Sequence, residues 1–132
     1  AKEQGYEADA VVCADDVPCG RPAPWMCLEN ARQLDAYPMR AIVKVDDTVV
    51  GIRAGANAGM ATEGVALAGN LVGLGLDEWN RLTMDERDTK LAEARQQLEA
   101  SGADFVINTI ADLPGVLDKL QGESSPATSR ET

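Results

Sequence analysis

Residues 43–59 read VKVDDTVVGIRAGANAG, and this stretch indicates the fold class of the chain. It begins inside an apolar run, residues 41–45, that has the length and composition of a short buried β-strand. Two adjacent carboxylates, Asp46 and Asp47, follow the run, and residues 49–58 then show the apolar spacing of a helix. The sequence therefore predicts a strand, an acidic turn and a helix in direct succession.

The rest of the chain repeats this alternation of short apolar runs and helical periods. Apolar runs predict strands at residues 8–14, 62–67 and 105–107, and helical spacing predicts helices at residues 22–34 and 111–120. A polar helical stretch is predicted from about residue 77, with its strongest part at residues 83–101. Strands that alternate with helices favour parallel βαβ units, so we predict an α/β protein with a doubly wound parallel sheet. Ligands of such sheets bind beyond the carboxyl ends of the strands, where Asp46 and Asp47 are expected.

Local signals indicate where several elements begin and end. Thr83 with Glu86 has the spacing of a capping box at a helix start, and Gly59 and Gly102 are placed to end helices. The glycine-rich residues 68–75 lack the spacing of a phosphate-binding loop, so we interpret them as a rim beside the site.

The composition argues against several classes of function. The chain has 132 residues, enough for one domain or part of one, and its formal net charge is -10. This acidity, without a cluster of Lys or Arg, argues against a nucleic-acid partner. The chain has no histidine, and Cys13, Cys19 and Cys27 lack CxxC spacing. A zinc site, a Ser-His-Asp triad and a Cys-His pair are therefore not expected.

The same features indicate location. Three unpatterned cysteines suit a reducing cytoplasm, and no run approaches the 18 apolar residues of a membrane span. We therefore expect a cytoplasmic protein without a membrane partner. The polar residues 121–132 are expected to be a disordered tail. The chain begins without Met, in the pattern of a helix end that enters a strand, so we expect a preceding segment.

The Asp46–Asp47 pair raises an electrostatic question, because adjacent carboxylates repel each other unless one is protonated or a cation compensates them. A hard divalent ion is the simplest compensation, since Mg²⁺ commonly uses one or two carboxylates together with water and substrate phosphate. The alternative is structural: one Asp caps the following helix and the other is solvated. The local pattern leaves both interpretations open.

Arg21 lies in GRPAPW, residues 20–25, where a loop enters a helix whose first turn suits the two prolines. Its guanidinium and the N–H groups of that turn would suit a phosphoryl oxygen, and the alternative is an ordinary surface arginine. A second acidic pair, Asp15 and Asp16, is interpreted as a loop or capping element. Cys19 in the same loop is interpreted as structural.

The order and spacing of GRPAPW, VKVDDTVVGI and AGANAGM resemble the second half of a haloacid dehalogenase-type (HAD-type) hydrolase. In that superfamily a Lys or Arg before a Pro-x-Pro helix start stabilises the phosphoryl group, and a later acidic pair holds Mg²⁺. The resemblance therefore implies that Arg21 stabilises a phosphoryl group and that Asp47, with Asp46, binds Mg²⁺.

Within the superfamily the chain is more similar to the phosphonoacetaldehyde hydrolase family. The similarity rests on DDVPCGRPAPWM, YPMRAIVKVDDTVVGI, NAGMATEGVALAGN, GLGLDEW and SGADFVINTIADLPGVLDKL, in the family's order. It implies that residues 1–120 are the C-terminal part of a HAD-like Rossmannoid core, without its cap domain and first strand. The implied reaction is Mg²⁺-dependent hydrolysis of phosphonoacetaldehyde to acetaldehyde and phosphate, and the implied full-length form is a homodimer.

The departures from the family pattern carry further expectations. The family's aspartate nucleophile, in a DxAGT-like motif, and its Schiff-base lysine, in the cap, have no counterpart in this chain, so we expect the chain alone to be inactive. Lys44 is not a candidate for the Schiff base, because it lies inside a predicted strand. Many relatives carry Gly at the position of Asp46 and a second Asp at that of Gly51. Asp46 is therefore expected to replace the acid missing at Gly51.

Two further positions concern packing. Ala61 and Glu63 stand where relatives usually have Trp and Val, and an ionised, unpaired Glu63 inside a two-sided sheet would be strongly destabilising. Trp25 and Trp79 have helical neighbours and are expected to pack against them.

Three alternative functions remain open. The chain could belong to another HAD-type phosphatase or phosphomutase, because the residues that select the substrate lie mostly in the cap. A phospho-acceptor receiver domain is also doubly wound and acidic, but its acidic pair follows the first strand. A non-catalytic remnant or interaction module without a bound ion is the third alternative.

Overall fold

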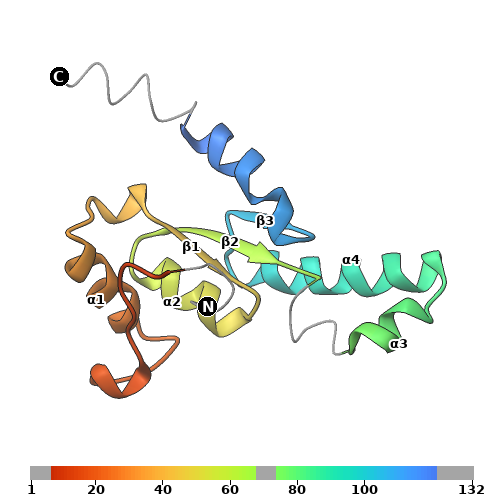
Figure 1. The fold of residues 1–132 in the computed structure, drawn as a ribbon, viewed down its shortest axis with the longest axis horizontal. Helices are drawn as coiled ribbons and strands as arrows, with labels where there is room; N and C mark the ends of the chain where they lie inside the picture. The colour runs from red at the N-terminus through yellow and green to blue at the C-terminus, as the bar shows by residue number, and fades with distance from the viewer. Residues whose placement is uncertain (1–6, 68–73, 122–132) are drawn as a thin grey trace.

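The computed structural model describes residues 7–67 and 74–121 of the chain. Its centre is a sheet of parallel strands in the order β1-β2-β3 (Figure 1). The strands are β1 (Val43–Asp46), β2 (Ala61–Val65) and β3 (Phe105–Ile107). The predicted α/β class with a parallel sheet is therefore confirmed, and β3 has the bounds expected from the sequence.

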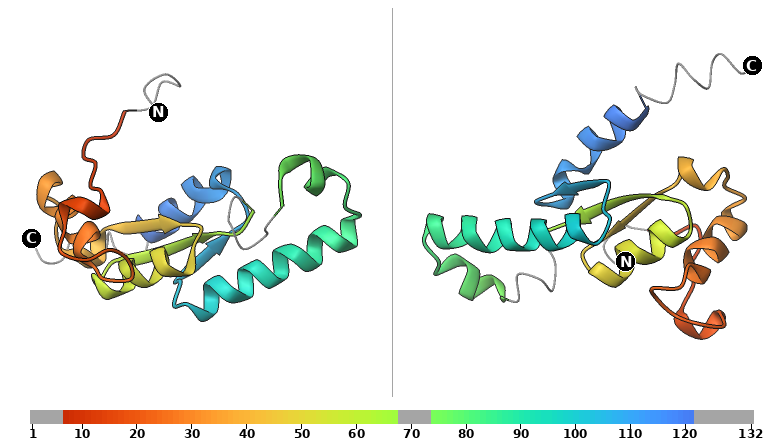
Figure 2. Two further views of the ribbon diagram at one scale, coloured as in Figure 1. Left: turned by 90° about the horizontal axis from the view of Figure 1, so that it is seen from below. Right: turned by 180° about the vertical axis from the view of Figure 1, so that it is seen from behind.

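The helices of the described residues surround this sheet. They are α1 (Trp25–Leu34), α2 (Val49–Asn57), α3 (Leu76–Asn80), α4 (Met84–Ala100) and a helical segment at residues 113–121, with 3-10 turns at η2 (Ala14–Asp16), η3 (Met39–Ala41) and η4 (Ile110–Asp112). The helices α2 and α4 connect successive strands and pack on one face, and residues 113–121 lie on the other side of the strands (Figure 2, left). No helix in the described parts of the chain is long and apolar enough to cross a bilayer.

The helix ends follow the signals in the sequence. The hydroxyl of Thr83 accepts a hydrogen bond from the backbone N–H of Glu86, and the Glu86 side chain accepts one from the N–H of Thr83, which confirms the capping box. Gly59 and Gly102 have φ of 84° and 101°. Both are left-handed positions that favour glycine after a helix, as predicted.

Glycine at position 55 allows α2 to lie close to the sheet. A Cβ atom at Gly55 would be 2.6 Å from Cγ of Lys44 on β1 and 2.9 Å from Cγ2 of Thr62 on β2. Because Lys44 pairs with Thr62 in the register, both side chains point toward α2. Side chains alternate along a strand, so Val45 and Glu63 point to the opposite face.

The core consists of two clusters of mostly small side chains. One joins α1 to α2, and the other joins α2 to α4. Their buried members are Cys27, Ala31, Ala54, Ala58 and Met60 in the first cluster, and Ile52, Ala66, Ala94 and Leu98 in the second. The face of the sheet that carries α2 and α4 is thus covered mainly by helix side chains, and Val106 of β3 packs against the second cluster.

Three sequence-based predictions of local structure are wrong. Residues 8–14 form no strand but run as irregular chain into η2, since no described strand lies beside them to accept their backbone hydrogen bonds. The helical stretch expected from about residue 77 is interrupted between α3 and α4, whereas its strongest part, residues 83–101, corresponds to α4. Trp25 is 45 % exposed rather than packed, whereas Trp79 packs against the second core cluster as predicted. The glycine-rich loop and the tail fall largely outside the described residues.

Glu63 is a buried ionisable residue in the centre of the sheet. It lies on the central strand between Val45 and Phe105, and its side chain is fully buried. Among the described residues, neither carboxylate oxygen has a hydrogen-bond partner. Burial raises its pKa to about 7, although the charge of Arg95 acts in the opposite direction. Burial therefore favours the neutral form of Glu63, because desolvation penalises the ionised carboxylate.

Candidate functional site

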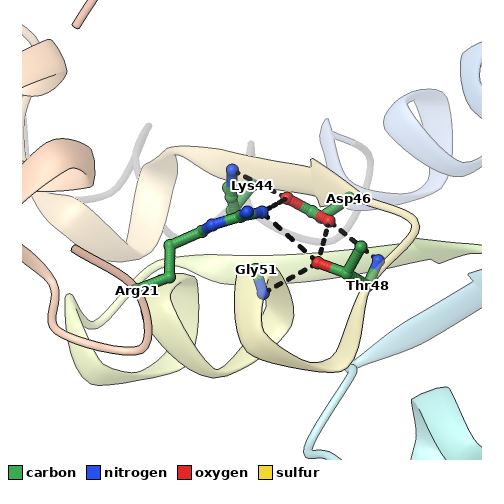
Figure 3. A network of polar contacts seen from close by, with 5 residues as sticks. All are labelled: Arg21, Lys44, Asp46, Thr48 and Gly51. Atoms are coloured by element: carbon green, nitrogen blue, oxygen red, sulfur yellow. Dashed lines mark hydrogen bonds and ion pairs between the residues drawn. The ribbon is translucent and has the colours of Figure 1, made fainter. Parts of the chain in front are cut away.

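The candidate site lies where β1 ends and α2 begins (Figure 3). Asp46 is the last residue of β1, and it lies two residues after Lys44, so both side chains emerge on the face that carries α2. Thr48 is the N-cap of α2, and its hydroxyl accepts a hydrogen bond from the N–H of Gly51 at 3.1 Å. The cap is therefore Thr48, and the alternative in which Asp46 or Asp47 caps this helix is not what the structure shows.

Asp46 is the centre of the polar network. Its Oδ1 accepts hydrogen bonds from the backbone N–H of Thr48 at 2.8 Å and from the Thr48 hydroxyl at 2.7 Å. Its Oδ2 lies 3.1 Å from Nζ of Lys44 and 3.7 Å from a guanidinium nitrogen of Arg21. Burial raises the pKa of Asp46, but the hydrogen bonds from Thr48 and the charge of Lys44 outweigh it, so the pKa lies below its ordinary value.

Arg21 reaches this network from a segment 25 positions earlier than Asp46, ahead of α1. Its guanidinium donates a hydrogen bond of 3.4 Å to the Thr48 hydroxyl in addition to its ion pair with Asp46. The carbonyl oxygen of Pro22 accepts a hydrogen bond from the Asn57 side chain at 2.8 Å, which ties the segment to the far end of α2. The structure thus brings Arg21 and Asp46, two of the three predicted site residues, into contact.

Asp47 follows Asp46 directly but lies outside this network. It is half-buried, and within the described ranges no hydrogen bond or ion pair involves it. No group of three or more Cys, Asp or Glu side chains in those ranges could enclose a metal ion. The adjacent carboxylates of Asp46 and Asp47 alone would not complete the shell of an ion such as Mg²⁺, so water and phosphate oxygens would have to supply the other ligands.

A cleft of about 790 Å³ adjoins the network, between β1, α1, α2 and the segment before η2. Arg21 and Lys44 line it together with mostly apolar residues from the chain before η2, from α1 and from α2. Cys27 also lines it, and burial raises the pKa of its thiol despite the nearby charge of Lys44. The two cations therefore stand at the border between an apolar hollow and the acidic turn.

The second acidic pair has a local role. The carboxylate of Asp16 accepts a hydrogen bond of 2.8 Å from the backbone N–H of Cys13 and closes η2. This agrees with the predicted capping function. Cys19 is exposed and does not line the cleft.

Sequence reasoning missed two members of the network, Lys44 and Thr48. Lys44 was considered only as a Schiff-base residue, but the two-residue period of a strand already places it on the same face as Asp46. Thr48 precedes the first helical residue of α2, the position at which threonine most often caps a helix. Both signals are present in the sequence.

No family model matches this chain. A phosphonoacetaldehyde hydrolase from Bacillus cytotoxicus is 44% identical over 121 residues, which are 92% of this chain and 46% of that protein. A phosphonoacetaldehyde hydrolase-like protein from Syntrophobacter fumaroxidans is 46% identical over 116 residues, 88% of this chain and 42% of the relative. The chain thus spans less than half the length of these curated relatives.

Among solved structures, a phosphonoacetaldehyde hydrolase-like protein from Oleispira antarctica superimposes with a TM-score of 0.86 at 43% identity. The match covers 89% of this chain and 43% of that one. A conserved haloacid dehalogenase-like protein of unknown function from Agrobacterium tumefaciens matches with a TM-score of 0.54 at 26% identity, over 76% of this chain and 36% of that one.

Proposed function

The chain belongs to the phosphonoacetaldehyde hydrolase family of HAD-like hydrolases, and we propose that it supplies the phosphoryl- and metal-binding corner of such an enzyme. The proposed reaction is hydrolysis of the P–C bond of phosphonoacetaldehyde, which yields acetaldehyde and phosphate. The observation that carries the proposal is the convergence of Arg21 on the Asp46–Thr48 turn, with Asp47 beside it. The guanidinium of Arg21 and the carboxylate of Asp47 then lie at the carboxyl end of β1, the end of a parallel strand at which ligands of such sheets bind.

Each residue has a separate part in the proposal. The guanidinium of Arg21 neutralises and orients the phosphonate oxygens, because its planar N–H groups suit a tetrahedral anion. The carboxylate of Asp47 would hold Mg²⁺, with Asp46 as the neighbouring carboxylate. When bound, the ion supplies further neutralisation of charge on the phosphoryl group. Thr48 holds the turn in place through the cap of α2.

We also propose that the chain alone does not hydrolyse phosphonoacetaldehyde. Its 132 residues contain no DxAGT-like segment to supply the aspartate nucleophile. Lys44 does not supply the imine-forming amine, because its ammonium is 3.1 Å from Asp46 and pairs with that carboxylate. A group held as a cation by an ion pair is a poor nucleophile toward an aldehyde.

A chimera tests this proposal. The N-terminal part of the Bacillus cytotoxicus relative, up to the point where the similarity begins, would be joined to this chain. Acetaldehyde release would be followed with alcohol dehydrogenase and NADH, and phosphate release in parallel. We expect equal amounts of both products from the chimera and none from the chain alone. Release of acetaldehyde by the chain alone would contradict its inactivity. A folded chimera that leaves phosphonoacetaldehyde intact would contradict the proposed reaction.

A further inference from the structure

We infer that Asp46 is a positioning residue that holds the guanidinium of Arg21 at the phosphoryl site, and is not itself a ligand of the metal ion. The inference rests on the proposed function for the identity of the anion. It divides the acidic pair into two roles: Asp47 faces the ion, and Asp46 organises the cations around it.

The contacts of Asp46 already occupy its acceptor capacity. An ionised carboxylate offers about four lone-pair sites on its two oxygens. Oδ1 accepts two hydrogen bonds from Thr48, and Oδ2 faces Lys44 and Arg21. The Asp46 side chain is only 10% exposed. An ion that bound Asp46 would have to displace one of these donors, whereas Asp47 has none to displace among the described residues.

The location of the Asp46 side chain is also fixed by packing. Its carboxylate lies directly over Gly51, in the space that a side chain at that position would take. Gly51 is buried, and its N–H is held by the Thr48 hydroxyl. The carboxylate is thus enclosed by the first turn of α2 on one side and by the two cations on the other.

The balance of charges in the network also supports a positioning role for Asp46. Lys44 and Arg21 both approach a single carboxylate oxygen, so one positive charge is not matched within this group. Arg21 is the more exposed of the two cations, with 42% of its side chain accessible against 27% for Lys44. One nitrogen of its guanidinium contacts Thr48 and Asp46, and among the described residues no hydrogen bond involves its other N–H groups, which could bind an external anion. Because Asp46 already orders the Arg21 side chain, Arg21 loses less conformational entropy when it binds the anion.

Nitrogen-15 NMR of the arginine side chains tests the inference on the chain itself. We expect the Nε of Arg21 to be ordered in the unaltered chain, while exposed Arg53 serves as the reference for a mobile guanidinium. Asp46→Asn should make Arg21 as mobile as Arg53 and weaken binding of inorganic phosphate by about fivefold. Asp47→Asn, the matched control, should leave the order of Arg21 unchanged. If Asp46→Asn does not fold, Thr48→Val removes the other acceptor of Arg21 and should also loosen it.

Calorimetric titration with Mg²⁺ provides the second readout. Asp47→Asn should abolish binding of the ion, and Asp46→Asn should retain it within about threefold. Loss of Mg²⁺ binding in Asp46→Asn, with Arg21 still ordered, would overturn the inference. An Arg21 that is mobile in the unaltered chain would overturn it as well. A chain that binds no Mg²⁺ but keeps Arg21 ordered through Asp46 would contradict the proposed metal site and support the positioning role.

Discussion

The carboxylate of Asp46 lies where a side chain at Gly51 would begin. A Cβ atom built on Gly51 would overlap both carboxylate oxygens and the Cγ atom of Asp46. Because Asp46 ends β1 and Gly51 belongs to the first turn of α2, this contact joins the strand to the helix. The identities of the two residues are therefore interdependent, because a side chain at position 51 and the Asp46 carboxylate would occupy the same space.

Gly51→Ala should destabilise the chain because the new methyl group must displace the Asp46 carboxylate. We expect a loss of about 1–3 kcal/mol in the free energy of unfolding, as in other overpacked sites. In an Asp46→Gly background the same substitution should be neutral or stabilising by about 0.5–1 kcal/mol, since alanine favours a helix over glycine. Urea unfolding of the four proteins in this double-mutant cycle measures the coupling.

Gly115→Ala is the matched control for this cycle. Gly115 lies in the helical segment 113–121, and a Cβ atom there would meet nothing within 4 Å. This substitution should stabilise the chain slightly in both backgrounds. Additive effects of Asp46→Gly and Gly51→Ala would show that the two positions do not share one space.

Glu63→Val should stabilise the fold. Valine has about the volume of glutamate and removes two buried oxygens that have no partner in the described ranges of the chain. We expect a gain of about 1–3 kcal/mol in urea unfolding at pH 7. Glu63→Gln, which stays polar but cannot ionise, should recover only part of this gain. A lower stability of Glu63→Val than of the unaltered chain would mean that the carboxyl group makes a stabilising contact.

The free energy of unfolding should decrease with rising pH because of the titration of Glu63. Its folded pKa of about 7 lies above the ordinary value of 4.5, so the folded chain binds more protons than the unfolded chain between these values. The contribution of Glu63 to the free energy of unfolding is fully present below pH 4.5 and is lost as the pH rises through about 7. This loss amounts to about 3 kcal/mol.

Other carboxylates also titrate in this range, so the measured quantity is the difference in unfolding free energy between the unaltered chain and Glu63→Gln. This difference should grow in favour of Glu63→Gln from pH 4.5 to about 7 and stay constant above it. A difference that is the same at pH 5 and pH 8 would contradict the raised pKa.

Much of the fold could be predicted from local signals. The helix expected at residues 49–58 is α2 with a difference of one residue, and the capping box at Thr83 marks the start of α4. These features depend on residues close together in the sequence. The strand expected at residues 8–14 failed because a strand also needs a neighbour, and no described strand pairs with that segment.

The candidate site was predictable in composition but not in geometry. The residue types and order of Arg21, Asp46 and Asp47 indicated a phosphoryl- and metal-binding role. That Lys44 and Arg21 both pair with Asp46, and that Gly51 makes room for it, depends on the packing of α2 against β1. Linear spacing does not contain that packing, so the contacts of Asp46 with Thr48, Lys44 and Arg21 could not be predicted from the sequence.

The most direct test of the proposed function is the rate of acetaldehyde release by the chimera when Asp47 is replaced. Asp47→Asn should lower kcat/KM by about 100-fold or more, because it removes the carboxylate assigned to the ion. Asp15→Asn, at an exposed acid in η2, should leave the rate unchanged. Equal rates for the chimera with and without Asp47→Asn would contradict the assignment of this corner as the metal- and phosphoryl-binding site.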